Sequence, residues 1–255
     1  MIDYFNGELR QVAAQDFSHL AWNSGFFTTF KVVDQVIVDL PLHLARLAAS
    51  LQSVGLALPW LDFQQIIRQL LQKNQLSSAR LKLMVYRQSG QVNCWLQILP
   101  LKVDNSPRIL AIYPQPRPAD LRFRHKSINY SENIRLNQLA QKNGFADYLF
   151  VDEKGRVLET TFCNIFFVNK QEIVTPSSQL PILPGTMRKK ILGLQRVKNI
   201  QIYDSEILLA EIGKFEAAFL SNAIIGVAPI KQIGKVKFAE SSILQMIRNK
   251  ILLPE

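Results

Sequence analysis

The amino-acid sequence predicts an α+β protein, in which groups of strands and groups of helices follow one another rather than strictly alternating. Its 255 residues are 48% hydrophobic and 20% charged, a balance that is ordinary for a folded chain with a buried core. Segments rich in aromatic and β-branched residues occur in groups, separated by segments with helical hydrophobic spacing. Neither the glycine-rich dinucleotide motif nor the phosphate-loop motif occurs, so a doubly wound nucleotide-binding sheet is not expected.

The first half of the chain is expected to contain two strand groups around two helices. Strands are predicted where β-branched and aromatic residues cluster, and helices where leucine and isoleucine recur every three or four residues. The predicted strands are 26–33, 36–40, 79–88, 92–103 and 108–113, and the predicted helices are 40–55 and 60–75. A proline run at 114–118 then stops both kinds of element. It predicts a boundary between a domain of residues 1–115 and a domain of residues 116–255.

The second half is expected to be rich in strands, with helices near its start, middle and end. A helix over 133–144 ends at Gly144, because glycine readily adopts the conformation that closes a helix. Residues 146–176 carry three strands, with turns at 154–155 and 169–170. The remaining predicted elements are a loop and helix over 183–195, two strands around a polar loop over 215–234, and a closing helix over 241–253.

The charge of the chain points to small anionic ligands rather than to nucleic acid. Lysine and arginine total 30 against 20 acidic residues, for a net charge of +10. Such a balance suits nucleic acid, a membrane surface, or a ligand that carries phosphate or carboxylate. The cations are scattered, however, and the densest clusters, at 122–126 and 187–190, are short. No RNA-binding signature, zinc-finger spacing or basic zipper accompanies them, so no nucleic-acid partner is expected.

The sequence predicts a reduced, cytoplasmic protein without a metal centre. Its cysteines, Cys94 and Cys163, are far apart, and its histidines have no metal-ligand spacing. No stretch reaches the roughly 18 apolar residues that a membrane-spanning helix needs. The first ten residues lack the charged and apolar regions of a secretory signal peptide. We therefore expect no disulfide framework, no metal and no membrane partner.

Several separated motifs, in one order along the chain, resemble those of class IV pyridoxal-phosphate enzymes. They lie at 25–34, 43–47, 125–168, 180–192 and 220–230, so the resemblance covers most of the chain. The family contains branched-chain aminotransferases, D-amino acid aminotransferases and aminodeoxychorismate lyase. The resemblance implies the two-domain fold-type IV architecture, with a smaller N-terminal α/β sandwich domain and a larger C-terminal domain that has a β-barrel-like core. It also implies pyridoxal 5'-phosphate as the cofactor, a small anionic substrate and a homodimer.

Two residues resemble those that carry out the chemistry in that family. Lys126, in the stretch HKSINY, matches the lysine that attaches to the aldehyde of the cofactor and later moves a proton at the substrate carbon. An amine does this only while it is neutral, a state that burial or a nearby cation favours. Glu159, in VLETTF, matches the carboxylate that pairs with the pyridine nitrogen and makes the ring a better electron sink. The alternative for each is an ordinary surface side chain.

A second set of residues resembles the binding site for the cofactor phosphate. Arg46, in HLARL, matches the family's phosphate arginine, whose planar guanidinium can hold two phosphate oxygens. Gly185 and Thr186 precede a predicted helix, where backbone N–H groups and a hydroxyl can donate to phosphate. A simple helix cap is the alternative for this pair. Ser221 and Asn222 match the family's other phosphate-side loop.

The resemblance gives other residues less defined roles. Asn164 matches an asparagine of the family that is expected to be structural. Tyr130 either contacts the cofactor or packs beside it. The arginines expected to line the approach of an anionic substrate, with a generally basic surface as the alternative, are Arg46, Arg87, Arg122, Arg124 and Arg188.

Two motifs favour the lyase over a transaminase. The segment FFTTFKV at 26–32 resembles the lyase form, with Thr28 and Thr29 facing the substrate on one interpretation. The segment SNAIIGVAPI at 221–230 resembles the lyase version of its loop. We therefore expect 4-amino-4-deoxychorismate to be converted to pyruvate and 4-aminobenzoate, a folate precursor. A transaminase of branched-chain or D-amino acids remains the alternative.

One stretch departs from the family. Where its members carry the pattern D-R-x-x-x-x-G-D-G, this chain has DFSHLAWNSG over 16–25. Asp16 and Gly25 align with the pattern, but the arginine and the second aspartate are missing. The departure leaves open a third interpretation, in which the chain is a catalytically impaired relative that acts as a binding or scaffold protein.

Overall fold

The computed structural model describes residues 1–15 and 17–252 and divides into two compact units. The first unit contains Met1–Val103 and His125–Ser131, and the second contains Asp104–Arg124 and the chain from Glu132 onward. The proline run at 114–118 therefore lies inside the second unit, while the segment around Lys126 belongs to the first. Each unit combines one sheet with a few helices, which confirms the α+β class. Asp16, which aligns with the family pattern, lies outside the described residues.

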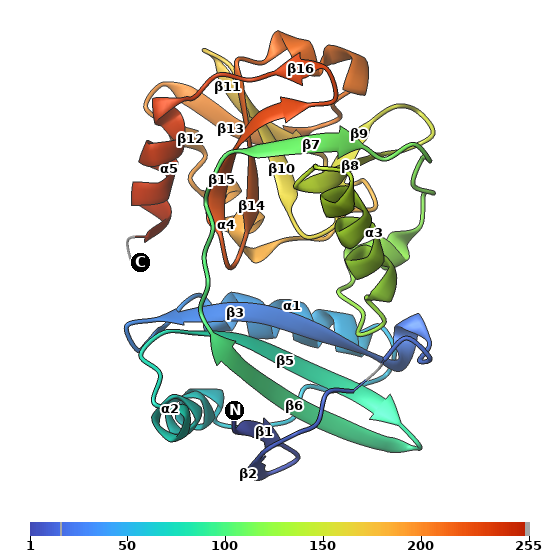
Figure 1. The fold of residues 1–255 in the computed structure, drawn as a ribbon, viewed down its shortest axis with the longest axis vertical. Helices are drawn as coiled ribbons and strands as arrows, with labels where there is room; N and C mark the ends of the chain where they lie inside the picture. Colours follow the sequence, from blue (N-terminus) through green and yellow to red (C-terminus); the bar gives the residue numbers. More distant parts are fainter. Residues whose placement is uncertain (16, 253–255) are drawn as a thin grey trace. The chain divides into compact units, whose positions relative to one another are not determined.

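Over the described residues, the first unit is built on a six-stranded antiparallel sheet with the order β2-β1-β6-β5-β3-β4 (Figure 1). Its strands are β1 (Asp3–Phe5), β2 (Glu8–Arg10), β3 (Gly25–Val33), β4 (Val36–Ile37), β5 (Ala79–Gln88) and β6 (Gln91–Pro100). Its helical elements are η1 (Trp22–Ser24), α1 (Leu40–Gln52) and α2 (Phe63–Asn74). The sequence predicted both α-helices and the strands from β3 to β6, but not β1 and β2.

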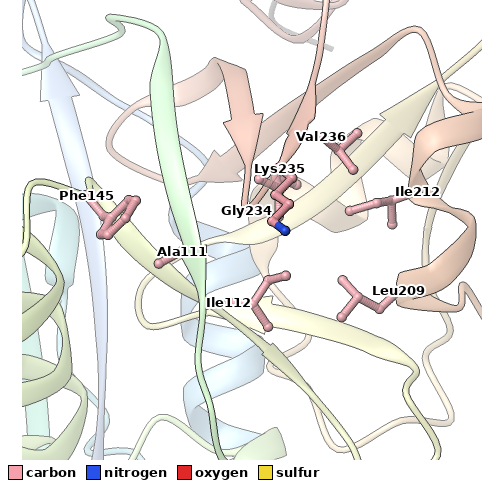
Figure 2. A pocket seen from close by; sticks show the side chains of 9 residues that line it. Ala111, Ile112, Phe145, Leu209, Ile212, Gly234, Lys235 and Val236 are labelled. Atoms are coloured by element: carbon pink, nitrogen blue, oxygen red, sulfur yellow. The ribbon is translucent and has the colours of Figure 1, made fainter.

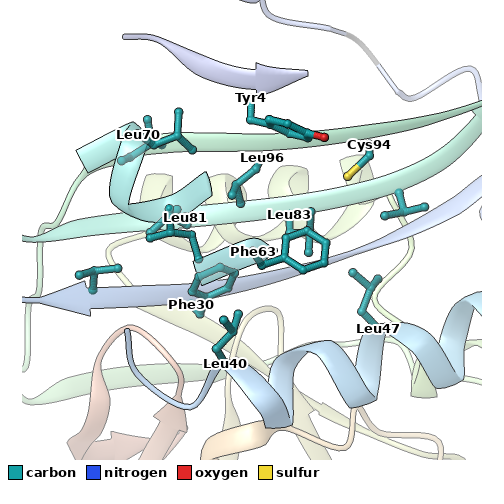
Figure 3. Packing of buried hydrophobic residues seen from close by; sticks show 14 of the residues in the cluster. Tyr4, Phe30, Leu40, Leu47, Phe63, Leu70, Leu81, Leu83, Cys94 and Leu96 are labelled. Atoms are coloured by element: carbon teal, nitrogen blue, oxygen red, sulfur yellow. The ribbon is translucent and has the colours of Figure 1, made fainter. Parts of the chain in front are cut away.

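Alternation along β3 lets this strand serve two different faces of the sheet. Phe26 and Phe30 join the core that the sheet forms with the two helices, among buried leucines such as Leu47, Leu81 and Leu83 (Figure 3). Burial of each such side chain contributes about 1.5–3 kcal/mol to folding. Because successive strand side chains point to opposite faces, the residues of odd number in β3 belong to the other face.

Over the same described part of the chain, the second unit has a ten-stranded sheet. Nine of its strands follow the order β12-β13-β11-β10-β14-β15-β7-β8-β9, and the tenth, β16, pairs with β15. The strands are β7 (Arg108–Ile112), β8 (Asp147–Val151), β9 (Val157–Thr160), β10 (Asn164–Val168), β11 (Glu172–Pro176), β12 (Arg196–Val197), β13 (Ile200–Ser205), β14 (Ala217–Asn222), β15 (Gly226–Ile233) and β16 (Val236–Lys237). Strand β9, at one end of the order, turns directly into β10, in its middle, and the Thr160 N–H donates to the Cys163 carbonyl at 2.9 Å. The sheet therefore curls back on itself, as a barrel-like core requires.

Helices cover parts of this curled sheet. They are α3 (Ser131–Lys142), α4 (Thr186–Gly193) and α5 (Ser242–Leu252), with the short η2 (Leu121–Arg124) and η3 (Leu209–Lys214). Met187 of α4 and Ile247 of α5 share one buried cluster with the sheet, and Leu136 of α3 belongs to another. All three α-helices fall where hydrophobic spacing predicts them. The sequence did not predict strands β12 and β13 or the 3₁₀ helix η3.

A pocket of about 490 Å³ opens in the second unit. Its lining is mainly apolar and comes from β7, Phe145, η3 and the β15–β16 hairpin, which adds Lys235 (Figure 2). None of the residues that the sequence singled out for a cofactor or substrate lines this pocket.

Candidate active site

The segment that carries Lys126 is held against β3 by backbone hydrogen bonds. The Phe27 N–H donates to the Lys126 carbonyl at 2.8 Å, and the Ile128 N–H donates to the Gly25 carbonyl at 3.0 Å. Glycine is needed at position 25, because a Cβ there would lie 2.3 Å from the Cβ of Tyr86. The backbone of Lys126 is thus fixed relative to the sheet of the first unit.

Two lysine amines lie over the ring of Phe27. Lys126 Nζ is 4.7 Å from the ring centroid and donates to the Tyr130 hydroxyl at 3.1 Å. Lys82 Nζ, from β5, is 4.4 Å from the same centroid. Burial lowers the pKa of Lys82 to about 8, and the neighbouring Arg80 cation lowers it as well. The two amines thus share one aromatic ring, and the lowered pKa belongs to Lys82.

Lys82 belongs to a basic stretch of one sheet face. In the β3–β5 register Thr29 lies opposite Lys82, and Lys31 lies opposite Arg80. Residues opposite each other point to the same side, so these four side chains share a face with Phe27. We call this set, Phe27, Thr29, Lys31, Arg80 and Lys82, the Phe27 face. It suits a ligand that carries more than one negative charge.

Thr28 lies on the opposite face from Thr29 and is fully buried. Its Oγ1 is 2.7 Å from His43 Nδ1 and accepts a hydrogen bond from Arg46 Nη2 at 2.9 Å. Burial and the adjacent Arg46 charge together lower the pKa of His43 to about 3, so its imidazole is neutral at physiological pH. The interpretation that both threonines face the substrate conflicts with strand alternation, which allows only one of two consecutive residues to do so.

The arginines expected along the substrate approach have varied surroundings. Arg87 is exposed and, having odd number in β5, lies on the face away from Lys82. Arg122 pairs with Asp120 at 2.5 Å, and Arg124 donates to the carbonyls of 178–180. Arg188 is buried, and its Nη2 donates to the Pro176 carbonyl at 2.7 Å. Arg188 also pairs with Asp204 at 3.2 Å, and its buried Nε has no hydrogen-bond partner among the described residues.

In the second unit, the carboxylate of Glu159 is buried and accepts hydrogen bonds from three donors. Oε1 accepts from Arg117 Nη1 at 2.9 Å, and Oε2 accepts from Asn164 Nδ2 and from the Leu183 N–H, each at 3.1 Å. Charge-assisted hydrogen bonds of this kind favour the ionised carboxylate. Glu159 therefore has the environment of a buried, oriented anion, and Asn164 contributes to its position.

Sequence reasoning missed Arg117. Its guanidinium lies 3.9 Å from the Phe150 ring centroid and 4.4 Å from that of Phe123, and its backbone N–H donates to the Val151 carbonyl at 2.8 Å. Stacking between aromatic rings and pairing with a carboxylate hold this side chain in one orientation. The only local signal was an arginine between two prolines, in a run whose composition is typical of a linker.

The N-terminus of α4 is packed closely against Asn164. Gly185 caps this helix, and a Cβ on it would lie 2.1 Å from Asn164 Oδ1. Thr186 is the first helical residue and is buried. The first N–H groups of a helix have no partner within the helix and favour anions. The absence of a side chain at position 185 keeps this end of α4 close to the Glu159 cluster.

Ser221 lies directly opposite Asn164 in the β10–β14 register. It is fully buried, and its Oγ has no hydrogen-bond partner among the described residues. A buried hydroxyl without a partner is costly, and such a group is typical of a position that binds a ligand. Asn222 instead closes its own loop, accepting from the N–H groups of Ile224 and Ile225 at 2.9 Å. The Ser221 hydroxyl is therefore available to a ligand.

The described residues contain no cluster of three or more histidine, cysteine, aspartate or glutamate side chains that could hold a metal ion. In the same part of the chain, no helix is long and apolar enough to cross a membrane.

Solved structures share the fold of this chain. A branched-chain aminotransferase from Thermoproteus uzoniensis superimposes with a TM-score of 0.86 at 18% identity, covering 98% of this chain and 93% of that one. The pyridoxal-phosphate-bound form of a hypothetical aminotransferase from Mycobacterium tuberculosis gives 0.84 at 19% identity, covering 99% of both chains. These likenesses confirm the two-domain, fold-type IV architecture.

A family model for amino-transferase class IV matches residues 25–233, and the chain belongs to this family of pyridoxal-phosphate-dependent enzymes. Its relatives carry two kinds of name. A protein of Rickettsia bellii, named a probable branched-chain-amino-acid aminotransferase, is 24% identical over 276 residues, covering 97% of this chain and 93% of that protein. The aminodeoxychorismate lyase of Vibrio harveyi is 27% identical over 109 residues, covering 43% of this chain and 40% of that protein.

Proposed function

We propose that this protein is a pyridoxal-phosphate-dependent lyase that converts 4-amino-4-deoxychorismate to pyruvate and 4-aminobenzoate, the folate precursor. The observation that carries the choice of substrate is the basic Phe27 face, where Lys82 shares an aromatic ring with Lys126. A dicarboxylate matches this face, whereas the apolar side chain of a branched-chain amino acid does not.

Each unit carries residues for which we propose a role toward the cofactor. In the first unit, Lys126 is proposed to attach the cofactor, with Tyr130 orienting its amine, and Arg46 is proposed to hold the phosphate. In the second unit, Glu159 is proposed to keep the pyridine nitrogen protonated, with Asn164 and Arg117 holding its carboxylate. The N–H groups of 185–186 and the Ser221 hydroxyl are proposed to donate to phosphate. When bound, the cofactor supplies an electron sink.

The chemistry asked of the chain is proton movement and substrate orientation. The reaction removes the ring proton on the amine-bearing carbon and breaks the ether C–O bond on the neighbouring ring carbon. Enolpyruvate leaves and takes up a proton to become pyruvate, and the ring becomes aromatic. Lys126 Nζ is proposed to take that proton, because a neutral amine beside Tyr130 can act as a general base. Lys82 is proposed to bind a substrate carboxylate, with Thr29 opposite it as a further donor.

A transaminase is the second candidate, because several relatives are named branched-chain aminotransferases. Because the stretch 16–25 departs from the family pattern, a catalytically impaired relative is the third candidate. We further expect a homodimer in the cytoplasm, so that light scattering should give about twice the chain mass of 29.1 kDa.

One assay separates these candidates. Protein loaded with the cofactor is incubated with 4-amino-4-deoxychorismate and no amino acceptor, and pyruvate and 4-aminobenzoate are quantified. Equal release of both products supports the lyase. Glutamate formation from leucine or a D-amino acid with 2-oxoglutarate, without pyruvate release, overturns it in favour of the transaminase. Stoichiometric cofactor binding with neither activity would identify the impaired relative.

A further inference from the structure

Thr28, His43 and Arg46 form one hydrogen-bonded cluster in the first unit. We propose that Thr28 and His43 are positioning residues that fix the plane of the Arg46 guanidinium for the cofactor phosphate. This inference rests on the proposed function, in which Arg46 binds that phosphate, and concerns only the first unit.

The geometry begins with spacing on one helix. His43 and Arg46 are three residues apart on α1, so their side chains lie on the same helix face. That face packs on β3, where Thr28 is fully buried and His43 is only 1% exposed. Thr28 Oγ1 lies within hydrogen-bond distance of both, at 2.7 Å from His43 Nδ1 and 2.9 Å from Arg46 Nη2.

Two hydrogen bonds at the Thr28 hydroxyl link the three residues. Arginine can only donate, so Thr28 Oγ1 accepts from Arg46. Thr28 Oγ1 also bonds His43 Nδ1, donating or accepting according to which nitrogen of the neutral imidazole carries the proton. The bond to His43 holds the Thr28 hydroxyl in place, and that hydroxyl holds the Arg46 guanidinium.

The consequence concerns the guanidinium plane. Its donors form a rigid fork, so one Nη2 hydrogen bond sets the direction of the others. Because the threonine hydroxyl orders Arg46 in advance, less rotamer freedom is lost when the phosphate binds. Loss of the hydroxyl should therefore weaken phosphate binding about tenfold. It should not affect the binding of a cofactor analogue that lacks phosphate.

The experiment compares the dissociation constants of pyridoxal 5'-phosphate and pyridoxal, measured by absorbance titration of the full chain. Thr28→Val should raise the constant for pyridoxal 5'-phosphate about tenfold and leave that for pyridoxal unchanged. His43→Leu should act in the same direction. Thr28→Ser and His43→Asn, which keep a hydroxyl and an acceptor, should remain within about twofold of wild type.

A matched control is available in the second unit. Thr175 is also fully buried, and its Oγ1 donates to the Ile165 carbonyl at 2.7 Å. Thr175→Val should leave the ratio of the two dissociation constants unchanged. Circular dichroism at the titration temperature establishes whether each variant is folded. If Thr28→Val does not fold, His43→Leu tests the positioning role in its place.

The outcomes are distinguishable. If Thr28→Val or His43→Leu weakens both ligands equally, or neither, the residues only pack and the positioning role is overturned. If wild-type protein binds pyridoxal as tightly as pyridoxal 5'-phosphate, the proposed phosphate site itself fails. If Thr175→Val shifts the ratio as much as Thr28→Val, the effect is not specific to Arg46 and the inference is likewise overturned.

Discussion

Arg117 Nη1 donates to Glu159 Oε1 at 2.9 Å, with side chains that are only 6% and 10% exposed. Such a buried pair is costly to desolvate, and removing one partner leaves an uncompensated charge. The Phe123 and Phe150 rings beside the guanidinium keep Arg117 in place. The pair therefore fixes the position of the carboxylate that we propose as the partner of the pyridine nitrogen.

Breaking this ion pair should destabilise the protein without cofactor. Glu159→Gln keeps the size and the acceptor for Asn164 but leaves Arg117 without a counter-charge, so the free energy of unfolding in urea should fall by about 3 kcal/mol. Arg117→Met should cost a similar amount. The double variant should lose clearly less than the sum of the two single losses, because neither charge is then left alone. Additive losses would show that the pair is not coupled.

Lys126 should be required for covalent retention of the cofactor. After borohydride treatment, wild-type protein should keep cofactor through denaturation and gel filtration, and Lys126→Ala should keep none. Lys142→Ala, at an exposed lysine near the end of α3, is the matched control and should behave like wild type. Equal labelling of Lys126→Ala and wild type would mean that another amine carries the cofactor.

Lys82 should set the pH limit of substrate binding. Burial lowers the pKa of Lys82 to about 8, so its positive charge is present below that pH and lost above it. We expect KM for the anionic substrate to rise as pH increases through about 8. Lys82→Met should raise KM about tenfold at pH 7 with a smaller effect on kcat, and Lys82→Arg should move the rise in KM to higher pH. A KM profile that is identical in Lys82→Met and wild type contradicts this role.

Gly185 should tolerate no side chain. A Cβ there would lie 2.1 Å from Asn164 Oδ1, so Gly185→Ala must displace Asn164 and, with it, a donor to Glu159. We expect a loss of about 1–3 kcal/mol in unfolding free energy, together with weaker cofactor binding. At Gly193, the other end of α4, an added methyl group would meet nothing within 4 Å, so Gly193→Ala should be neutral or stabilise by up to about 1 kcal/mol. Similar stability of the two variants would refute the proposed packing.

His43 should make stability depend on pH below neutrality. Its pKa is lowered to about 3 by burial and by Arg46, the neighbouring cation, whereas an unfolded histidine titrates near 6.5. The unfolded chain therefore binds the proton first, and the contribution of neutral His43 is complete above about pH 6.5 and is lost as pH falls towards 3. Between pH 7 and pH 5 the loss should be about 2 kcal/mol. His43→Asn should lack this component when urea unfolding is compared at the two pH values.

Local patterns predicted much of the fold. The turn at 89–90 joins β5 and β6, and the turn at 34–35 joins β3 and β4, with positive φ at all four residues. Such turns match the twist of the strands that they connect, so a hairpin can be predicted from the residues of its own turn and strands. By contrast, β1 and β13 each pair on one side with a strand that is distant in the chain, β6 and β11 respectively. Their pairing depends on the sheet that receives them.

The sequence by itself determined the α+β class, the positions of the main helices and hairpins, and the motifs that contain Lys126 and Glu159, because these depend on neighbouring residues. Only the tertiary structure decided which side chains meet. Arg117 and Glu159 are 42 residues apart, and Thr28 turned inward to His43 and Arg46 rather than outward beside Thr29. A hydrogen bond or ion pair forms where folding brings donor and acceptor together, and that distance is set by the packing of the whole unit rather than by local spacing.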